Sequence, residues 1–191
     1  EHAAESGANV PDYPVIFMKA PTAAQDPLSP IVLPRHLRSD KVDFEGELAV
    51  VIGRPCKNVS RGEALDHVLG YTCGNDVTAR QLQRSDGQWT RAKSFDGLAP
   101  IGPFIVTNIR PEGRAIECRV NGRVVQKGNT NQLIFPIPRL VGFISRVMTL
   151  LPGDLIFTGT PAGVGPISPG DVVEVEVEGI GVLGNPVVGE G

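Results

Sequence analysis

Two glutamates, Glu45 and Glu47, stand two positions apart in a run of mostly apolar residues, 42–53. On a β-strand, side chains at i and i+2 point to the same face, so both carboxylates would project together from a segment of buried character. Neighbouring carboxylates repel each other and need a cation or a proton in such surroundings. The pattern predicts half of a site for a hard divalent cation, with an exposed edge strand carrying solvated acids as the alternative.

Asp76 follows a second mostly apolar run, 70–75, at the point where the chain becomes polar. Two interpretations are open: it begins a helix as the N-cap, or it is a third carboxylate ligand. Three carboxylates leave open positions on an octahedral ion, which a substrate with two neighbouring oxygens can fill. Arg80 and Gln83 lie four and seven residues further on, so on a helix they would share its face and bind a substrate carboxylate or carbonyl.

Lys93 has small and aromatic neighbours in the segment 87–96. One interpretation is an exposed lysine; the other is a fixed ammonium that stabilises an enolate as it forms. The glycine-rich segment 158–165, which contains Thr160, allows backbone N–H groups to approach an anion, although a plain turn between strands is the alternative. This segment lacks the lysine of a nucleotide-binding phosphate loop.

His2 and Glu5 are three residues apart near the beginning of the chain. On one helical turn this spacing places imidazole and carboxylate side by side, and such a pair can activate a water molecule. A histidine at a chain end is otherwise typical of disordered surface.

The composition limits the functions that the chain can have. Its 191 residues, 41% of them apolar, suffice for one domain, 1–191, with a substantial core. A net charge of −3 disfavours nucleic acid, and no apolar run is long enough to span a membrane. Three cysteines without metal-type spacing favour a reducing compartment, so we expect a cytoplasmic protein. Because the chain does not begin with Met, we expect natural residues upstream of Glu1.

Frequent glycine (23) and proline (17) predict a mainly β fold with a few short helices. Asn121-Gly122 is a strong hairpin signal. Helices are expected from Ser60, which has capping-box spacing to Glu63, and over 138–150. Strands are expected over 15–19, 42–52, 101–106, 116–120, 123–126, 155–158 and 172–177.

Four motifs in this order, FEGELAVVIG (44–53), GNDVTAR (74–80), WTRAKSF (89–95) and TGTPAGVG (158–165), resemble the fumarylacetoacetate hydrolase family. The resemblance covers essentially the whole chain and implies a mixed β-sandwich roll, a homodimer and a small 2-oxo acid substrate. It implies that Mg²⁺ or Mn²⁺, with Ca²⁺ as a substitute in crystals, is held by Glu45, Glu47 and Asp76. The residues implied to face the substrate are Arg80, Gln83, Lys93 and Thr160.

Within that family, acylpyruvate hydrolases carry a His and a Glu three residues apart on a lid segment, which His2 and Glu5 match. Lys19 matches a lysine near the lid and is expected to bind substrate. The chain departs from the family in lacking the usual N-terminal portion and in a shorter stretch over 108–117.

Our main hypothesis is a metal-dependent hydrolase of acylpyruvates, in which His2 and Glu5 deliver water and C–C cleavage expels a pyruvate enolate stabilised by the metal and Lys93. Isomerisation of hydroxymuconate-type or hydroxyheptadienedioate-type diacids, or oxaloacetate decarboxylation, could use the same site without an attacking water. A non-catalytic β-domain that binds a metabolite is the alternative from another class.

Overall fold

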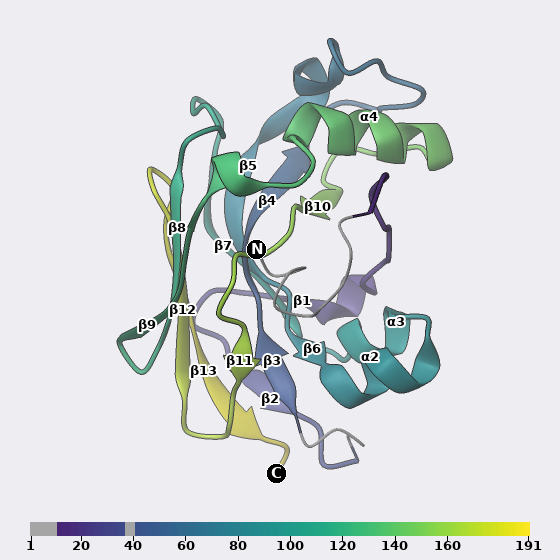
Figure 1. The fold of residues 1–191 in the computed structure, drawn as a ribbon. Helices are drawn as coiled ribbons and strands as arrows, with labels where there is room; N and C mark the ends of the chain where they lie inside the picture. The colour runs from purple at the N-terminus through teal and green to yellow at the C-terminus, as the bar shows by residue number, and fades with distance from the viewer. Residues whose placement is uncertain (1–10, 37–40) are drawn as a thin grey trace.

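The computed structural model describes residues 11–36 and 41–191, and these residues form a mainly β structure with a few short helices, as predicted. Two five-stranded sheets and one three-stranded sheet are present in this part of the chain (Figure 1). Most neighbouring strands are antiparallel, and two pairs, β1 with β7 and β13 with β2, are parallel. The sheets are therefore mixed, as the family resemblance implies.

The three sheets contain the following strands, named in the order in which they lie side by side. The first sheet consists of β1 (Ala24–Gln25), β7 (Ala99–Val106), β5 (Val68–Asn75), β4 (Gly46–Ile52) and β10 (Leu155–Phe157). The second consists of β2 (Ile31–Leu33), β13 (Gly181–Gly189), β12 (Val172–Val177), β8 (Ala115–Val120) and β9 (Arg123–Asn129). The small sheet consists of β11 (Gly165–Pro166), β3 (Val42–Phe44) and β6 (Thr78–Ala79).

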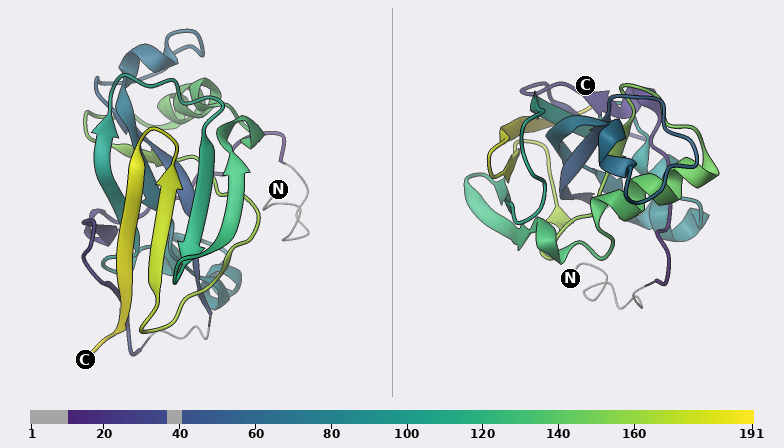
Figure 2. Two further views of the ribbon diagram at one scale, coloured as in Figure 1. Left: turned by 90° about the vertical axis from the view of Figure 1, so that its left-hand side faces the viewer. Right: turned by 90° about the horizontal axis from the view of Figure 1, so that it is seen from above.

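The two larger sheets pack face to face, and the long strands of the second sheet form one outer layer of the molecule (Figures 1 and 2). Apolar residues of both sheets bury one another between them, including Leu48, Val50, Cys118, Val173 and Val175. The helices lie on the opposite side of the first sheet (Figure 1). The first sheet is consequently covered on both faces, which explains why every residue of β4 is buried.

Three α-helices and three 3₁₀ turns complete the described structure. The α-helices are α2 (Arg80–Asp86), α3 (Thr90–Lys93) and α4 (Ile137–Val147), and the 3₁₀ turns are η1 (Pro21–Ala23), η2 (Ala64–His67) and η3 (Thr130–Gln132). The helix expected over 138–150 is confirmed, although it ends three residues earlier. The helix expected from Ser60 is wrong. Ser60 does donate to Glu63 (Oγ to Oε2, 2.6 Å), but only one 3₁₀ turn forms before the chain enters β5.

The hairpin at Asn121-Gly122 is confirmed, since both residues have positive φ, 52° and 76°, between β8 and β9. The strand expected over 15–19 is wrong: this segment has no regular structure and runs between the helices (Figure 1). β5 and β13 were not expected, because several glycines interrupt their apolar pattern.

The strand expected over 42–52 is divided at Glu45. β3 pairs with β11 and β6 in the small sheet, whereas β4 pairs with β10 and β5 in the first sheet. Glu45 thus lies where the chain passes from one sheet to the other, and this junction is the location of the candidate site.

Candidate metal centre

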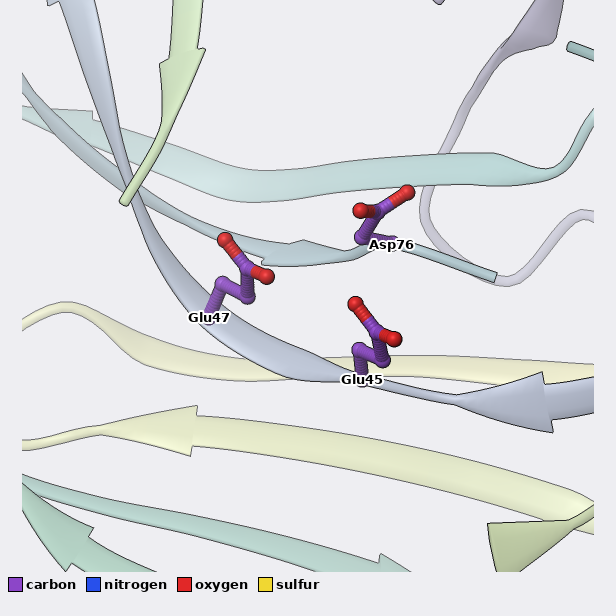
Figure 3. A group of neighbouring side chains, drawn as sticks. All are labelled: Glu45, Glu47 and Asp76. Atoms are coloured by element: carbon purple, nitrogen blue, oxygen red, sulfur yellow. The ribbon is translucent and has the colours of Figure 1, made fainter. Parts of the chain in front are cut away.

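Glu45, Glu47 and Asp76 form one buried cluster, in which one carboxylate oxygen of each lies within 4.8 Å of the others. Figure 3 shows both glutamates on the same side of their strand with Asp76 beside them. The period-two prediction for the glutamates is confirmed. Asp76 is not a helix N-cap, because it lies in the connection between β5 and β6, and α2 begins four residues later.

The backbone holds Glu45 and Asp76 together. The amide of Asp76 donates to the carbonyl of Glu45 at 2.9 Å, and the amide of Glu45 donates to the side-chain oxygen of Asn75 at 3.0 Å. Glu47 pairs in register with Gly74 on β5. The strand pairing therefore brings acids that are 29 and 31 residues apart in the sequence into one place.

Two lysines neutralise Asp76. Lys19 Nζ donates to Asp76 Oδ1 at 2.7 Å, and Lys93 Nζ donates to Asp76 Oδ2. Burial alone would raise the pKa of Asp76, but the two ammonium groups outweigh it and lower that pKa. The pKa of Lys19 is lowered, with burial as the largest cause, although Asp76 acts to raise it. Asp76 is therefore a carboxylate held ionised inside the protein.

Lys93 is 2% exposed and has three hydrogen-bond partners, one for each N–H of its ammonium. Besides Asp76, these are Glu45 Oε2 at 3.3 Å and Thr78 Oγ1 at 2.8 Å. Burial opposes its charge, but Asp76 and Glu45 outweigh burial and raise the pKa of Lys93. The ring of Phe17 also lies 4.5 Å from Nζ, so the irregular segment 11–20 covers this lysine. Exposed lysine, the alternative interpretation, is wrong.

Lys93 contacts Oε2 of Glu45, and Arg80 contacts the other carboxylate oxygen, Oε1. Arg80 Nη2 is 2.5 Å from Glu45 Oε1, its Nε donates to Asp43 Oδ2 at 2.7 Å, and its Nη1 donates to Gln83 Oε1 at 3.0 Å. Arg80 and Gln83 do share a helix face, as expected, but here they contact each other. The guanidinium bridges two buried acids.

Glu47 is the one cluster carboxylate that pairs with no cation in the described part of the chain, and its side chain accepts a hydrogen bond from the Gly159 amide at 2.7 Å. Burial, followed by the negative charges of Asp76 and Glu45, raises the pKa of Glu47 well above its ordinary value. A buried acid of this kind, with two further carboxylates at hand, suits Mg²⁺ or Mn²⁺, which prefer oxygen ligands. The residues present fit such an ion.

The family model described as fumarylacetoacetate (FAA) hydrolase, C-terminal, matches residues 1–188. The chain belongs to this family. A mitochondrial oxaloacetate tautomerase of Homo sapiens is 42% identical over 200 residues, which cover 98% of this chain and 63% of the human protein.

Two solved structures of fumarylacetoacetate hydrolase family proteins are similar. The 5-carboxymethyl-2-hydroxymuconate delta-isomerase from Mycobacterium smegmatis is 55% identical with a TM-score of 0.91, over 94% of this chain and 71% of that one. The fumarylacetoacetate hydrolase from Exiguobacterium antarcticum is 42% identical with a TM-score of 0.89, over 100% of this chain and 72% of that one. The same fold thus occurs in proteins named as isomerase and as hydrolase.

The structure brings most of the expected site residues that it describes together. Lys19, Arg80 and Lys93 contact the acidic cluster directly. Thr160 contacts the backbone of Gly46, between the two glutamates, at 2.9 Å. His2 and Glu5 lie outside the described residues. No helix in the described ranges is long and apolar enough to cross a membrane.

Asp43 is a buried residue of the site that sequence reasoning missed. It extends the period-two pattern of Glu45 and Glu47 by one step, and this alternation was a signal that could have identified it. Gln126, on β9 of the second sheet, is another. Its hydrogen bond to the Gly46 amide crosses between the sheets, and no local pattern predicts such a contact.

Proposed function

We propose that this chain is a divalent-metal-dependent enzyme that acts on a small 2-oxo acid through its enolate, and that its reaction is C–C hydrolysis of an acylpyruvate. The observation that carries the proposal is the cluster of Glu45, Glu47 and Asp76 beside the buried ammonium of Lys93. When bound, Mg²⁺ or Mn²⁺ supplies a Lewis acid that polarises the neighbouring carboxylate and 2-oxo oxygens of such a substrate.

The charges of the site favour an anionic substrate. Four buried carboxylates, those of the cluster and Asp43, face the cations Lys19, Arg80 and Lys93. With a divalent ion held by the cluster, these groups would place five positive charges against four negative ones, and the half-exposed Lys41, 3.6 Å from Asp43, adds a sixth. This surplus of positive charge attracts a carboxylate and stabilises the negative charge that an enolate places on its oxygen.

His2 and Glu5 have the water-activating role in this proposal. His2 accepts a proton from water while the water oxygen attacks the distal carbonyl of the acylpyruvate, and Glu5 orients the imidazole. The bond between that carbonyl carbon and C3 then breaks. Its electron pair passes into the enolate of pyruvate, beside Lys93, and C3 takes up a proton. The products are one carboxylic acid and pyruvate.

Isomerisation or tautomerisation is the second candidate, because similar proteins are named as an isomerase and an oxaloacetate tautomerase. These reactions move a proton next to a carbonyl and need the same enolate stabilisation by Lys93, but no attacking water. Oxaloacetate decarboxylation has the same requirement.

A turnover screen tests the proposal. The protein is incubated with acylpyruvates, fumarylpyruvate, oxaloacetate and hydroxymuconate-type diacids, with Mg²⁺ or Mn²⁺ and with EDTA as the control, and products are followed by NMR. We expect metal-dependent cleavage of an acylpyruvate that is lost in His2→Ala. Isomerase, tautomerase or decarboxylase activity that survives in His2→Ala would favour the second candidate. Substrate binding without turnover across the panel would instead indicate a non-catalytic metabolite-binding domain.

A further inference from the structure

Gln126 lies on β9, in the second sheet, and its side chain is 1% exposed. Its Oε1 accepts a hydrogen bond from the Gly46 amide at 2.9 Å. Its Nε2 donates to Thr160 Oγ1 and to the carbonyl of Pro161, both at 2.8 Å. Both N–H groups of the amide are used, so this side chain joins β9 to β4 and to the loop that follows β10.

The Thr160 hydroxyl continues this connection. Because its oxygen accepts from Gln126, its own hydrogen donates to the Gly46 carbonyl at 2.9 Å. The N–H and C=O of Gly46 belong to the two peptide groups that link it to Glu45 and to Glu47. Gln126 and Thr160 therefore hold the backbone between the two metal-binding glutamates from the face opposite to their side chains.

The same loop reaches the Glu47 carboxylate. Thr158 Oγ1 donates to the Leu48 carbonyl at 2.8 Å, and the amide of Gly159 donates to Glu47 Oε2 at 2.7 Å. Gly159 has a φ of 107°, a conformation that L-residues rarely adopt. Anchoring the loop at Thr160 and Pro161 thus also fixes the amide that orients Glu47.

The packing around these contacts leaves little room for adjustment. A Cβ atom on Gly46 would lie 3.2 Å from Cys118 Cβ and 3.3 Å from Gln126 Oε1. A Cβ atom on Gly128 would lie 2.7 Å from Pro161 Cβ. β4, the loop and β9 are in close contact, so a change of the Gln126 side chain should shift the backbone of β4 and of the loop.

We infer that Gln126 is a positioning residue for the metal-binding glutamates: it sets the place of Glu45 and Glu47 through Gly46, and the orientation of Glu47 through Thr160 and its loop. The inference rests on the proposed function, since it concerns the same carboxylates and the ion they would hold. Residues that orient metal ligands through hydrogen bonds typically change metal affinity 10- to 100-fold when removed.

Gln126→Met tests this role, because methionine has a similar length and makes none of the three hydrogen bonds. Asn185→Leu is the matched control: Asn185 is a buried amide on β13 that donates to the carbonyls of Asp26 and Ser29, at 2.9 and 2.8 Å, away from the acidic cluster. Mn²⁺ affinity is measured by calorimetric titration of the full chain. We expect at least a roughly tenfold loss in Gln126→Met and less than about twofold in Asn185→Leu, at comparable losses of melting temperature.

Thr160→Val keeps the shape of the side chain and removes the hydroxyl that links Gln126 to Gly46. We expect it to weaken Mn²⁺ binding as well, with the double variant Gln126→Met/Thr160→Val no weaker than the more affected single variant. Unchanged Mn²⁺ affinity in both single variants would overturn the inference and leave the proposed function intact. If Gln126→Met does not fold, Thr160→Val decides alone. No Mn²⁺ binding by the unaltered chain would overturn both proposals.

Discussion

Arg80 Nη2 lies 2.5 Å from Glu45 Oε1, so the guanidinium that we expect to bind substrate forms an ion pair with a residue of the acidic cluster. The same guanidinium donates through Nε to Asp43 at 2.7 Å. Both acids, Asp43 and Glu45, are buried. Removing one member of a buried ion pair leaves the other charge without compensation, which typically costs about 3–5 kcal/mol.

Arg80→Gln should therefore lower the free energy of unfolding by about 3 kcal/mol, measured by urea denaturation in EDTA. Asp43→Asn introduced together with it should recover part of the loss, because one of the two carboxylate charges that Arg80 compensates is then gone. The coupling energy between the two substitutions should exceed about 0.5 kcal/mol. Additive effects would show that the two side chains do not depend on each other.

Lys93→Met should raise the affinity for Mn²⁺ about tenfold and abolish turnover. The ammonium of Lys93 forms ion pairs with Asp76 and Glu45, the same carboxylates that would hold the ion. Its positive charge repels a bound cation, so removing it should strengthen Mn²⁺ binding. Calorimetric titration and the turnover screen measure the two effects. Lys127→Met is the control, since that lysine pairs with Glu117 on the exposed outer sheet. Weaker Mn²⁺ binding in Lys93→Met would contradict this view of the site.

How far the sequence predicts this site depends on the range of the contacts. Glu45 and Glu47 were predicted to lie together because strand periodicity is local. That Asp76 joins them could not be derived from spacing, because it depends on the pairing of β4 with β5. The glycines of β5 interrupt the apolar pattern from which a strand is predicted. The residue type and position of Asp76 left a third-ligand role as one of two interpretations, and the order of the motifs, through the family resemblance, favoured that role.

The same limit applies to the fold. The mainly β class and the hairpin at Asn121-Gly122 follow from composition and turn chemistry, which act over a few residues. The second sheet packs against Gly46 through contacts between residues far apart in the sequence, and no local sequence pattern predicts such contacts. For this reason the contact of Gln126 with the Gly46 amide could not be predicted.

Cys73 and Cys118 should react slowly with thiol reagents in the folded protein. Burial raises the pKa of each thiol to about 12. In the unfolded chain a thiol has a pKa of about 8.5. At about pH 8 we expect modification by a disulfide reagent to be at least about 100-fold slower in buffer than in urea. Rapid labelling of either residue, located by mass spectrometry, would contradict its burial.

The same shift predicts how these cysteines affect stability at alkaline pH. Between about pH 8.5 and about pH 12 the folded state keeps protons that the unfolded state loses, so stability falls as pH rises through this range. Cys73→Ala removes one of these groups and should show a shallower loss of melting temperature above about pH 9. An equal slope in Cys73→Ala and the unaltered chain would indicate that the thiol titrates alike in both states.

Glu47→Gln should be at least as stable as the unaltered chain without metal and less stable than it when Mn²⁺ is present. Since the pKa of Glu47 is raised in the folded state, the folded protein binds a proton there more tightly than the unfolded chain does. Stability in EDTA therefore falls as pH rises above the ordinary carboxyl pKa of about 4.3, and glutamine, which mimics the protonated acid, removes this loss. At about pH 7.5 without metal, Glu47→Gln should melt at or above the temperature of the unaltered chain.

With Mn²⁺ the order should change, because the ion stabilises only a protein that binds it. At an ion concentration of about 100 times the dissociation constant the unaltered chain should gain about 2.7 kcal/mol, a rise of roughly 5–10 °C for a chain of this size, and Glu47→Gln should gain little. Glu174→Gln, which neutralises a partly exposed acid on β12, controls for the loss of one charge. Equal stabilisation of Glu47→Gln and the unaltered chain by Mn²⁺ would exclude Glu47 as a ligand.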